Sequence, residues 1–410
     1  MSSDSVRNIV VVGGGIIGCT TAYYLTRHPA FVPSQVSITL LEASTRGAAQ
    51  GASGKAGGLV AKWAYPKELV NVSFNEHVKL ANEHNGKDRW GWRYVSTGSW
   101  EGRGDPLPDD LDARPSNSLK REKSLEKTLG LPDGRKVGSN RKLTGLPDDL
   151  LWVKEHLTQS YSSMAPEGAT AQVHPYLFTT SMLDLAKEKG AQFKSGTVTS
   201  IIQSGGKVTG VKYVEAGQSE SQTLPATDVV VCGGAWSPAL ISRLPIQGMR
   251  AHSVVIRTEA TAIIAPYVLF TEITGLGNGV VTPEIYARPD GTVYACGPGD
   301  YSPLPDNVDD VVVDPTACEN LLKNVCAISD ELRAGTTEVR QACYLPVSSI
   351  GGGPIIGEAE KIAKGLFVAT GHTCWGISNA PGTAKAMAEL VMEGHMKCAD
   401  LKRLHPSKFI

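Results

Sequence analysis

The glycine-rich segment near the N-terminus constrains the fold more than any other feature of the chain. Residues 8–12 are mainly apolar, and three glycines follow in the spacing Gly13-x-Gly15-x-x-Gly18. In such a motif the first glycine permits a tight turn, the second lets a pyrophosphate approach the backbone, and the third lets a helix pack closely on the strand. The N-terminus of that helix faces the phosphates with its partial positive charge. The segment therefore predicts a dinucleotide-binding βαβ unit.

A second strand and an acidic residue complete this unit. We expect a helix over residues 19–27 and a strand over residues 36–41, followed directly by Glu42. An acidic residue at this place accepts hydrogen bonds from the hydroxyls of the adenosine ribose. A carboxylate also disfavours a neighbouring 2'-phosphate, so Glu42 indicates a dinucleotide with a free ribose. The alternative for Glu42 is a solvated charge at a strand end.

Three later segments favour FAD over NAD, because an FAD domain must enclose the flavin as well as the adenosine. Small residues over 50–59 let an isoalloxazine ring lie close, with Ser53 available to the second phosphate. Residues 229–236 predict a buried strand that ends at a glycine pair. After a strand expected over 364–370, residues 371–377 precede a helix and would aim backbone N–H groups at the anionic edge of reduced flavin.

The middle of the chain predicts antiparallel strands and one exposed insertion. Alternating apolar residues on both sides of a glycine turn predict a hairpin from residue 197 onward. We expect further strands over 250–257 and 284–296, the second interrupted by a turn. Residues at about 101–150 are rich in Pro, Gly and charged side chains, which predicts loops and short exposed helices in a solvated insertion. The alternative for this insertion is a dedicated partner-binding surface.

The charge balance and the cysteine pattern exclude several classes of protein. The chain has 40 Lys and Arg against 41 Asp and Glu, a net charge of −1 that predicts no nucleic-acid or anionic-membrane partner. Eight scattered cysteines include no CxxC pair, so we expect neither a disulfide scaffold nor a bound metal. No apolar run reaches the length of a membrane span, and no leader precedes the first strand. We therefore expect a cytoplasmic protein.

Taken together, these segments resemble the FAD-dependent oxidoreductases of the D-amino acid oxidase, glycine oxidase and sarcosine oxidase superfamily, in a fungal-type branch. The resemblance runs nearly from end to end, except over about 101–150. The matching segments are residues 10–18, 41–44, 51–53, the hairpin at 198, and residues 231–237, 354–357 and 369–376. The resemblance implies an α/β fold, with a Rossmann-like FAD-binding domain and an inserted substrate domain of mainly antiparallel sheet. The FAD-binding domain would comprise residues 1–85, 155–240 and 335–410, and the substrate domain residues 86–154 and 241–334.

The resemblance places FAD against the glycine-rich segments and the loop before the last helix. His372 and Trp375 in that loop would lie beside the flavin ring, and they are the candidate catalytic residues. The candidate cofactor-binding residues are Gly13, Gly15, Ile16, Ile17, Gly18, Glu42, Ala43, Ser44, Ser53, Gly54, Lys55, Ala56, Gly57, Gly58, Val198, Cys232, Gly233, Gly234, Trp236, Cys343, Gly371, His372, Trp375, Gly376 and Ile377.

Two departures from the family's patterns bear on the substrate. Members that act on amino acids commonly hold the substrate carboxylate with an Arg in a Gly-Leu-Arg-Pro-like segment, which residues 340–346 do not reproduce. Some sarcosine-type oxidases place a Lys over the flavin to promote oxygen reduction, and residues 292–297 contain no Lys. The candidate replacements are Lys55, Lys62, Arg250 and Arg340, each of which would otherwise be a solvated or structural cation.

Aromatic residues and histidines near the matched segments have structural roles as their alternatives. The aromatic residues that would either wall a substrate pocket or pack in the core are Trp63, Tyr65, Trp236, Tyr344 and Trp375. His174 and His252 are expected to be structural.

Cys343 is a candidate for a covalent bond to the flavin. In sarcosine-type members, a Cys at a similar place bonds to the 8α position of the ring. The attacking species is a thiolate, which a nearby Arg340 would favour. The alternative is a packed, inert thiol, because free cysteines often behave as small buried apolar residues.

The activity that the resemblance implies is the oxidation of a C–N bond. A hydride leaves the carbon beside the nitrogen of an amine or amino acid for flavin N5, and water hydrolyses the imine product. Oxygen or another acceptor then reoxidises the flavin. The sequence shows no catalytic base. We therefore expect the protein to accelerate the reaction mainly by positioning the substrate against the flavin. The alternative is a flavin-binding protein with a mainly regulatory or scaffolding role in trafficking or assembly.

Overall fold

The computed structural model describes residues 6–105, 144–277 and 279–410. Its strands are β1 (Arg7–Val12), β2 (Val36–Glu42), β3 (Leu59–Ala61), β4 (Arg93–Tyr94), β5 (Ser96–Arg103), β6 (Thr158–Ser163), β7 (Thr170–Gln172), β8 (Gln192–Ser204), β9 (Lys207–Glu215), β10 (Ser221–Pro225), β11 (Asp228–Val231), β12 (Ile246–Arg257), β13 (Tyr267–Thr274), β14 (Glu284–Ala287), β15 (Thr292–Asp300), β16 (Thr336–Ser348), β17 (Ile355–Glu358) and β18 (Leu366–Thr370). Its α-helices are α1 (Ile16–Thr26), α2 (Ala52–Lys55), α3 (Lys67–Glu83), α4 (Gly86–Trp90), α6 (Pro175–Lys187), α7 (Ser237–Leu240), α8 (Pro315–Cys326), α9 (Asp330–Ala334) and α10 (Gly376–Glu393).

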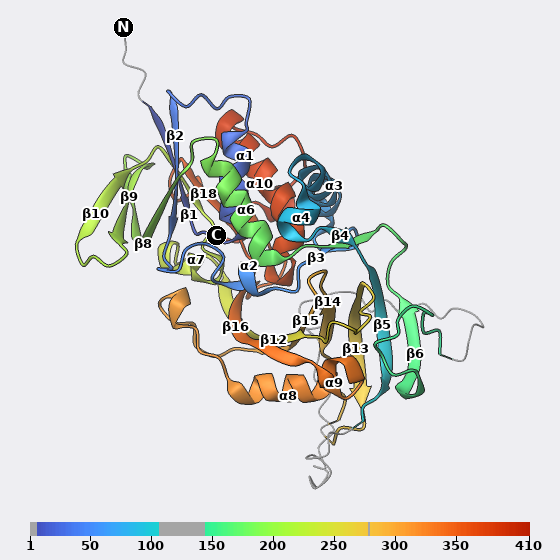
Figure 1. The fold of residues 1–410 in the computed structure, drawn as a ribbon. Helices are drawn as coiled ribbons and strands as arrows, with labels where there is room; N and C mark the ends of the chain where they lie inside the picture. The colour runs from blue at the N-terminus through green and yellow to red at the C-terminus, as the bar shows by residue number, and fades with distance from the viewer. Residues whose placement is uncertain (1–5, 106–143, 278) are drawn as a thin grey trace.

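An eight-stranded sheet in the order β10-β9-β8-β2-β1-β11-β18-β17 forms one half of the molecule, shown at the top of Figure 1. Strands β2, β1, β11 and β18 run parallel. Alternate residues of β1 enter different cores, because Ile9 and Val11 pack with the helices whereas Val10 and Val12 pack with β9. Burial on both faces is typical of a parallel strand and explains the unbroken apolar run.

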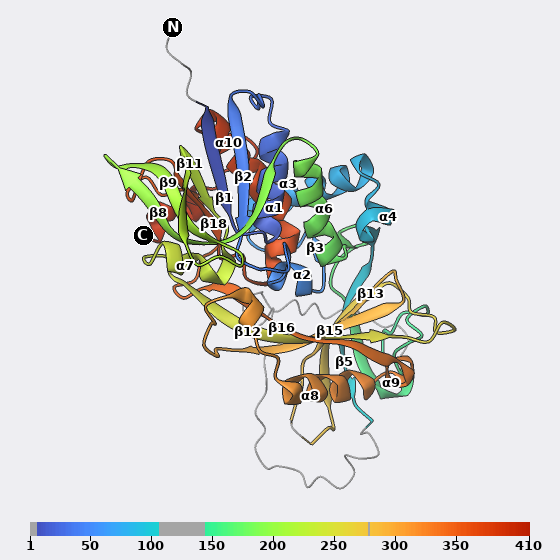
Figure 2. The same cartoon turned by 60° about the vertical axis from the view of Figure 1, so that its left-hand side comes forward.

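The first helix is enclosed on nearly every side. Helices α3, α6 and α10 surround α1 on one face of the eight-stranded sheet (Figures 1 and 2). All residues of α1 except Tyr24 are buried. A helix that is apolar all round belongs in the interior of a protein. The surrounding helices therefore hold the N-terminus of α1 in place against the end of β1.

A seven-stranded sheet in the order β16-β12-β15-β14-β13-β5-β6 forms the other half. One face packs on α8 and α9, where Val254 meets Leu321. The opposite face carries Val255 and Tyr286 in a cluster that includes Ala52 from the eight-stranded half. A small sheet in the order β3-β7-β4 completes the structure. The inner face of the seven-stranded sheet thus packs on the segment that follows the dinucleotide-binding unit.

Sheet membership bears on two of the domain boundaries predicted from the sequence, which stay a prediction. Residues 155–240 and 335–410 were expected in the FAD-binding domain, but β6 and β16 belong to the seven-stranded sheet. β6 pairs with β5, and β16 pairs along its length with β12. Such pairings join residues far apart in the chain, and the local sequence does not specify them.

The charged insertion differs from the prediction at both ends. Residues 101–103 belong to β5, which pairs with β13, and Leu150 is 1% exposed. The loops and exposed helices expected there are therefore wrong at these positions. Residues 106–143 lie outside the described part of the chain. The predicted hairpin after residue 197 and the hairpin of β14 and β15 are confirmed.

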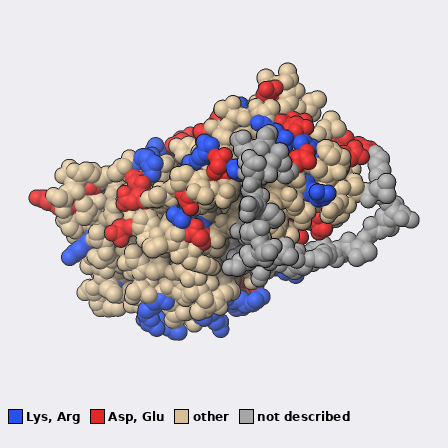
Figure 3. All heavy atoms as spheres, turned by 90° about the horizontal axis from the view of Figure 1, so that it is seen from below, with Lys and Arg blue, Asp and Glu red and all other residues tan. Residues whose placement is uncertain are grey.

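Charged side chains of both signs occur across the face shown in Figure 3. Neither Lys and Arg nor Asp and Glu cover that face, as the net charge of −1 suggests. Among the described residues, no helix is both long enough and apolar enough to cross a membrane.

Candidate cofactor and active site

A cavity of about 230 Å³ lies at the carboxyl ends of the parallel strands. Val12, Leu41, Cys232 and Thr370 bound it there, from or just after β1, β2, β11 and β18 respectively. Open α/β sheets bind ligands at this edge, where the loops that follow the strands can diverge. The cavity extends from Glu42 and its neighbours to the start of α10, so it can hold an extended molecule.

The structure brings most of the predicted cofactor-binding residues to this cavity. The predicted residues that line it are Gly13, Gly15, Ile16, Ile17, Glu42, Ala43, Ser53, Ala56, Val198, Cys232, Gly233, Gly234, Trp236, His372, Gly376 and Ile377. The predicted residues that lie outside its lining are Gly18, Ser44, Gly54, Lys55, Gly57, Gly58, Cys343, Gly371 and Trp375.

The glycine loop has the geometry that its sequence predicts. Gly13 adopts a φ of +108°, and a Cβ there would lie 2.6 Å from the carbonyl oxygen of Cys232. A Cβ at Gly15 would lie 3.0 Å from the hydroxyl of Ser53, which accepts a hydrogen bond from the N–H of Ile16 at 2.8 Å. A side chain at Gly15 would therefore fill the space between the first turn of α1 and α2. This cradle fits a pyrophosphate group.

Glu42 is buried rather than solvated, so the alternative of a surface charge is wrong. Its two carboxylate oxygens accept hydrogen bonds from the N–H of Gly14 at 2.5 Å and the N–H of Ser44 at 2.7 Å. Burial raises the pKa of Glu42, and these backbone hydrogen bonds oppose the increase. A carboxylate has about four lone-pair sites, so Glu42 retains acceptor capacity for ribose hydroxyls at the cavity wall.

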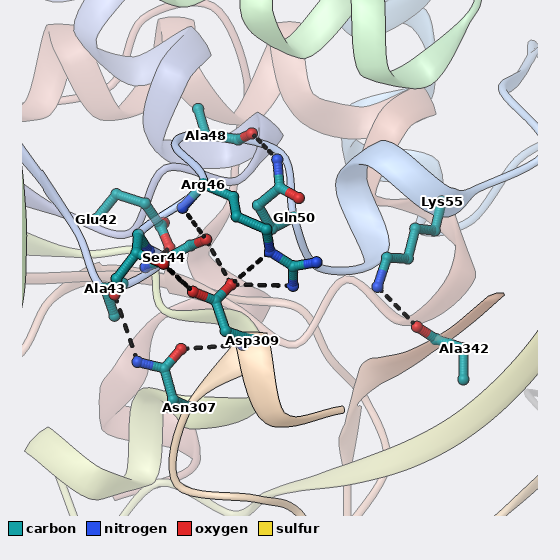
Figure 4. Close-up of polar contacts among 11 residues, drawn as sticks. Glu42, Ala43, Ser44, Arg46, Ala48, Gln50, Lys55, Asn307, Asp309 and Ala342 are labelled. Carbon is teal, nitrogen blue, oxygen red and sulfur yellow. Dashed lines mark hydrogen bonds and ion pairs between the residues drawn. The ribbon is translucent and has the colours of Figure 1, made fainter. Parts of the chain in front are cut away.

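Sequence analysis missed one wall of the cavity. Asp306, Asn307 and Val308 line it, although they belong to the connection between β15 and α8 in the other half of the molecule. The side chain of Asp309 hydrogen-bonds to Ser44 beside them (Figure 4). This connection is irregular and matches no motif, so no sequence signal could have placed it here.

The loop before α10 forms the opposite end of the cavity. His372 is buried, and its Nε2 lies 3.0 Å from the hydroxyl of Thr383. Burial lowers the pKa of His372 to about 3, so the imidazole is neutral at physiological pH. His372 lines the cavity as predicted, but its location and protonation suit a structural or positioning role better than proton transfer.

Three aromatic rings cluster where the loop meets the seven-stranded sheet. The ring of Trp63 lies 5.6 Å from that of Trp375 and 6.1 Å from that of Phe270, centroid to centroid. The Trp63 indole N–H donates to the hydroxyl of Thr170 at 2.9 Å. Trp375 itself packs in this cluster and does not line the cavity. The cluster reaches the cavity through Cys374, which belongs to the lining and packs with Trp375, so it forms an apolar wall one residue behind the cavity surface.

The four candidate cations are engaged elsewhere. Arg250 pairs with Asp300 at 3.1 Å, and Arg340 pairs with Glu319 at 3.5 Å. The Lys62 ammonium lies 4.8 Å from the centre of the Phe74 ring. The Lys55 ammonium donates to the carbonyl of Ala342 at 3.0 Å (Figure 4). Among the described residues, the cavity lining contains no Lys or Arg.

Cys343 is placed for packing rather than for attack. It is 7% exposed in the cluster on the inner face of the seven-stranded sheet, and the cavity lining begins at the next residue, Tyr344. Burial raises the pKa of the Cys343 thiol to about 11, although the nearby Lys55 opposes the increase. The thiolate required for a covalent bond is therefore disfavoured at neutral pH.

The remaining aromatic and histidine candidates mostly have structural partners. Trp236 and Tyr344 donate to backbone carbonyls from the cavity wall, whereas Tyr65 is 41% exposed. His174 accepts the N–H of Leu177 at the start of α6, and His252 accepts the N–H of Asp314. Within the described ranges, no cluster of His, Cys, Asp or Glu could hold a metal ion.

The fold and the cavity are those expected of a protein that binds an extended dinucleotide at the edge of a parallel sheet. Residues 8–390 match the family model described as FAD dependent oxidoreductase (DAO). The chain belongs to this family of FAD-dependent oxidoreductases, and its cofactor is FAD.

Comparison with individual proteins agrees with this assignment. The chain is 32% identical to the "Putative oxidoreductase TDA3" of Saccharomyces cerevisiae, over 100% of this chain and 96% of that protein. It is 31% identical to the "Putative oxidoreductase C1F5.03c" of Schizosaccharomyces pombe, over 98% of each. The solved structure of glycine oxidase from Geobacillus kaustophilus has a TM-score of 0.69 and 17% identity, and covers 99% of this chain and 100% of that one. This last likeness shows that the fold is shared.

Proposed function

We propose that this FAD-dependent oxidoreductase oxidises the C–N bond of a small amine or amino acid, giving an imine that water hydrolyses. The observation that supports the proposal is the aromatic cluster of Trp63, Phe270 and Trp375, which packs against the lining residue Cys374 at the end of the cavity next to α10. When bound, FAD would accept the hydride at flavin N5 and pass electrons to oxygen or another acceptor. The similarity in fold to a glycine oxidase is consistent with this chemistry.

The chain's own residues would contribute binding and the exclusion of water. An apolar wall disfavours a charged ammonium, so it favours the neutral amine whose lone pair assists hydride loss. His372 is held by Thr383 and is neutral, so we expect it to orient the loop rather than to exchange a proton. Holding a substrate C–H bond against the flavin would then supply most of the rate enhancement.

An anaerobic reduction assay tests the proposal. The holoprotein is mixed with matched pairs that differ by a carboxylate, namely sarcosine and dimethylamine, glycine and methylamine, and proline and pyrrolidine. We expect at least one compound to bleach the oxidised flavin band, and each pair reports whether the carboxylate matters. Admitting air afterwards tests oxygen as the acceptor, because an oxidase regains the band rapidly.

Dithionite supplies the control for the reduction assay. If dithionite reduces the flavin and no amine or amino acid does, the proposed reaction is contradicted and a regulatory or scaffolding role is favoured. A second control compares Trp63→Ala with Tyr65→Ala, since Tyr65 is an exposed neighbour outside the aromatic cluster. We expect only the first variant to slow reduction. Cell fractionation tests the proposed cytoplasmic location.

A further inference from the structure

Residues 303–310, here called the strap, cross from one half of the molecule to the other. The strap connects β15 to α8, and both of these elements belong to the half with the seven-stranded sheet. Its central residues nevertheless line the cavity that the other half forms at the ends of its parallel strands. The strap is therefore a wall of the cofactor cavity that the half with the seven-stranded sheet supplies.

Two backbone anchors hold the first part of the strap. The hydroxyl of Tyr344 donates to the carbonyl of Pro303 at 2.6 Å, and the indole N–H of Trp236 donates to the carbonyl of Pro305 at 2.7 Å. Tyr344 and Trp236 both line the cavity, on β16 and just after β11 respectively. The anchored end of the strap is thus fixed to the cavity rim.

Asp309 fastens the other end of the strap. Its carboxylate accepts a hydrogen bond from the Ser44 hydroxyl at 2.6 Å (Figure 4). It also accepts hydrogen bonds from the Thr45 N–H at 2.9 Å and the Thr45 hydroxyl at 2.8 Å. Arg46 adds a charged contact, with Nη2 at 3.0 Å. All three partners directly follow Glu42 and Ala43, where the adenosine end of the cavity lies.

The middle of the strap closes over the cavity between these fastenings. Val308 is 8% exposed and faces Gly51, where a Cβ would lie 3.5 Å from the Val308 side chain. Asn307 donates to the carbonyl of Ala43 at 3.4 Å (Figure 4). The strap contacts the eight-stranded half through side chains rather than through pairing of strands. Opening the strap would break these side-chain contacts but no strand pairing.

We propose that the strap is the gate through which FAD enters and leaves, and that Asp309 is its latch. An extended cofactor that reaches from Glu42 to Ile377 would lie behind the strap, so the strap must move for the cofactor to pass. Charge-assisted hydrogen bonds are roughly twice as strong as neutral ones, and Asp309 makes several at the free end. The latch therefore controls the rate of passage in both directions. This proposal goes beyond the proposed reaction and does not depend on the substrate.

Flavin exchange kinetics test the proposal without any substrate. Asp309→Asn keeps the size of the side chain but removes its charge, whereas Asp310→Asn makes the same change on the adjacent, exposed residue. Release is followed as the rise in free-flavin fluorescence after dilution, and uptake as its quenching when FAD is added to stripped protein. We expect both rates to rise by about tenfold in Asp309→Asn, because the charge-assisted contacts weaken. Asp310→Asn should match the parent.

Three outcomes would overturn the gate. The first is release at the parent rate in Asp309→Asn. The second is an equal acceleration in Asp310→Asn, which would reflect net charge rather than the latch. The third is faster release with slower uptake, because that pattern describes a damaged binding site instead of an opened one. Arg46→Gln changes an exposed partner of Asp309 and should also accelerate both the release and the uptake of FAD. This second variant keeps the test valid if Asp309→Asn folds poorly.

Discussion

The hydroxyl oxygen of Ser53 lies 2.8 Å from the backbone nitrogen of Ile16 and accepts its hydrogen bond. This contact ties α2 to the first turn of α1, so two of the segments that surround the pyrophosphate cradle keep a fixed separation. The glycine at position 15 lies directly beside the contact. The space that a phosphate needs is therefore set by a side chain from a segment outside the glycine motif.

Gly15→Val should abolish FAD binding. The new side chain would approach the Ser53 hydroxyl, since even a Cβ would lie 3.0 Å from it, and would occupy the phosphate space. We expect purified variant protein without the oxidised flavin band. Gly297→Val is the control, because a Cβ at Gly297 would lie 3.7 Å from its nearest neighbour, the Leu321 side chain, and Gly297 does not line this cavity. Full flavin content in Gly15→Val would contradict the site.

Glu42→Ala should weaken FAD binding without abolishing folding. The substitution removes the acceptor for the ribose hydroxyls and for the N–H groups of Gly14 and Ser44. A charge-assisted hydrogen bond contributes about 1.5 to 3 kcal/mol, so we expect the Kd for FAD to rise by roughly tenfold to a hundredfold. Titration of stripped protein measures this. Glu360→Ala, an exposed glutamate, is the control, and an equal Kd in both variants would sink the assignment.

Acid precipitation should release the flavin. The Cys343 thiol is buried with a pKa raised to about 11, and it lies outside the cavity lining. We therefore expect a yellow supernatant and a colourless pellet. A flavin that stays with the pellet of the parent protein, and not with that of Cys343→Ser, would show that the covalent bond forms despite this geometry.

As the pH is lowered, the folded protein should begin to lose stability at pH values well above the pKa values of its carboxylates. Burial lowers the pKa of His372 to about 3 and that of His77 to about 4, although hydrogen bonds to Ile377 and Ser378 oppose the shift at His77. An unfolded histidine has a pKa of about 6.5, so between these values the unfolded state binds protons that the folded state does not. The contribution of each histidine to the free energy of unfolding is therefore present in full above pH 6.5. It falls by about 2 kcal/mol for each histidine between pH 7 and pH 5.

Urea unfolding at pH 7 and pH 5, in excess FAD, measures this dependence. We expect His372→Gln to lose less stability between the two pH values than the parent does. His395→Gln should behave as the parent, because His395 is exposed. An unchanged pH dependence in His372→Gln would show that the buried imidazole already accepts a proton near neutral pH.

Sequence patterns within a short segment predicted the helices and strands whose formation depends on residues of that same segment. The run at Val10 and the glycines after it specify β1 and α1, and Glu42 follows from the next strand, so one short segment contained the dinucleotide-binding unit. The place of β16 depends on its pairing with β12, and the position of Asp309 depends on a partner at Ser44. Those relationships join distant residues, and neither end carries a distinctive sequence.

The wall of the cavity contains both Val12 and Ile377, so it is complete only after the segment that begins α10 has been synthesised. A nascent chain still on the ribosome has its glycine loop early, but has no flavin end of the pocket until α10 emerges. Enclosure of the whole cofactor therefore has to follow the synthesis of α10. Fragments that stop before Gly376 would keep the diagnostic motif and lack the completed pocket.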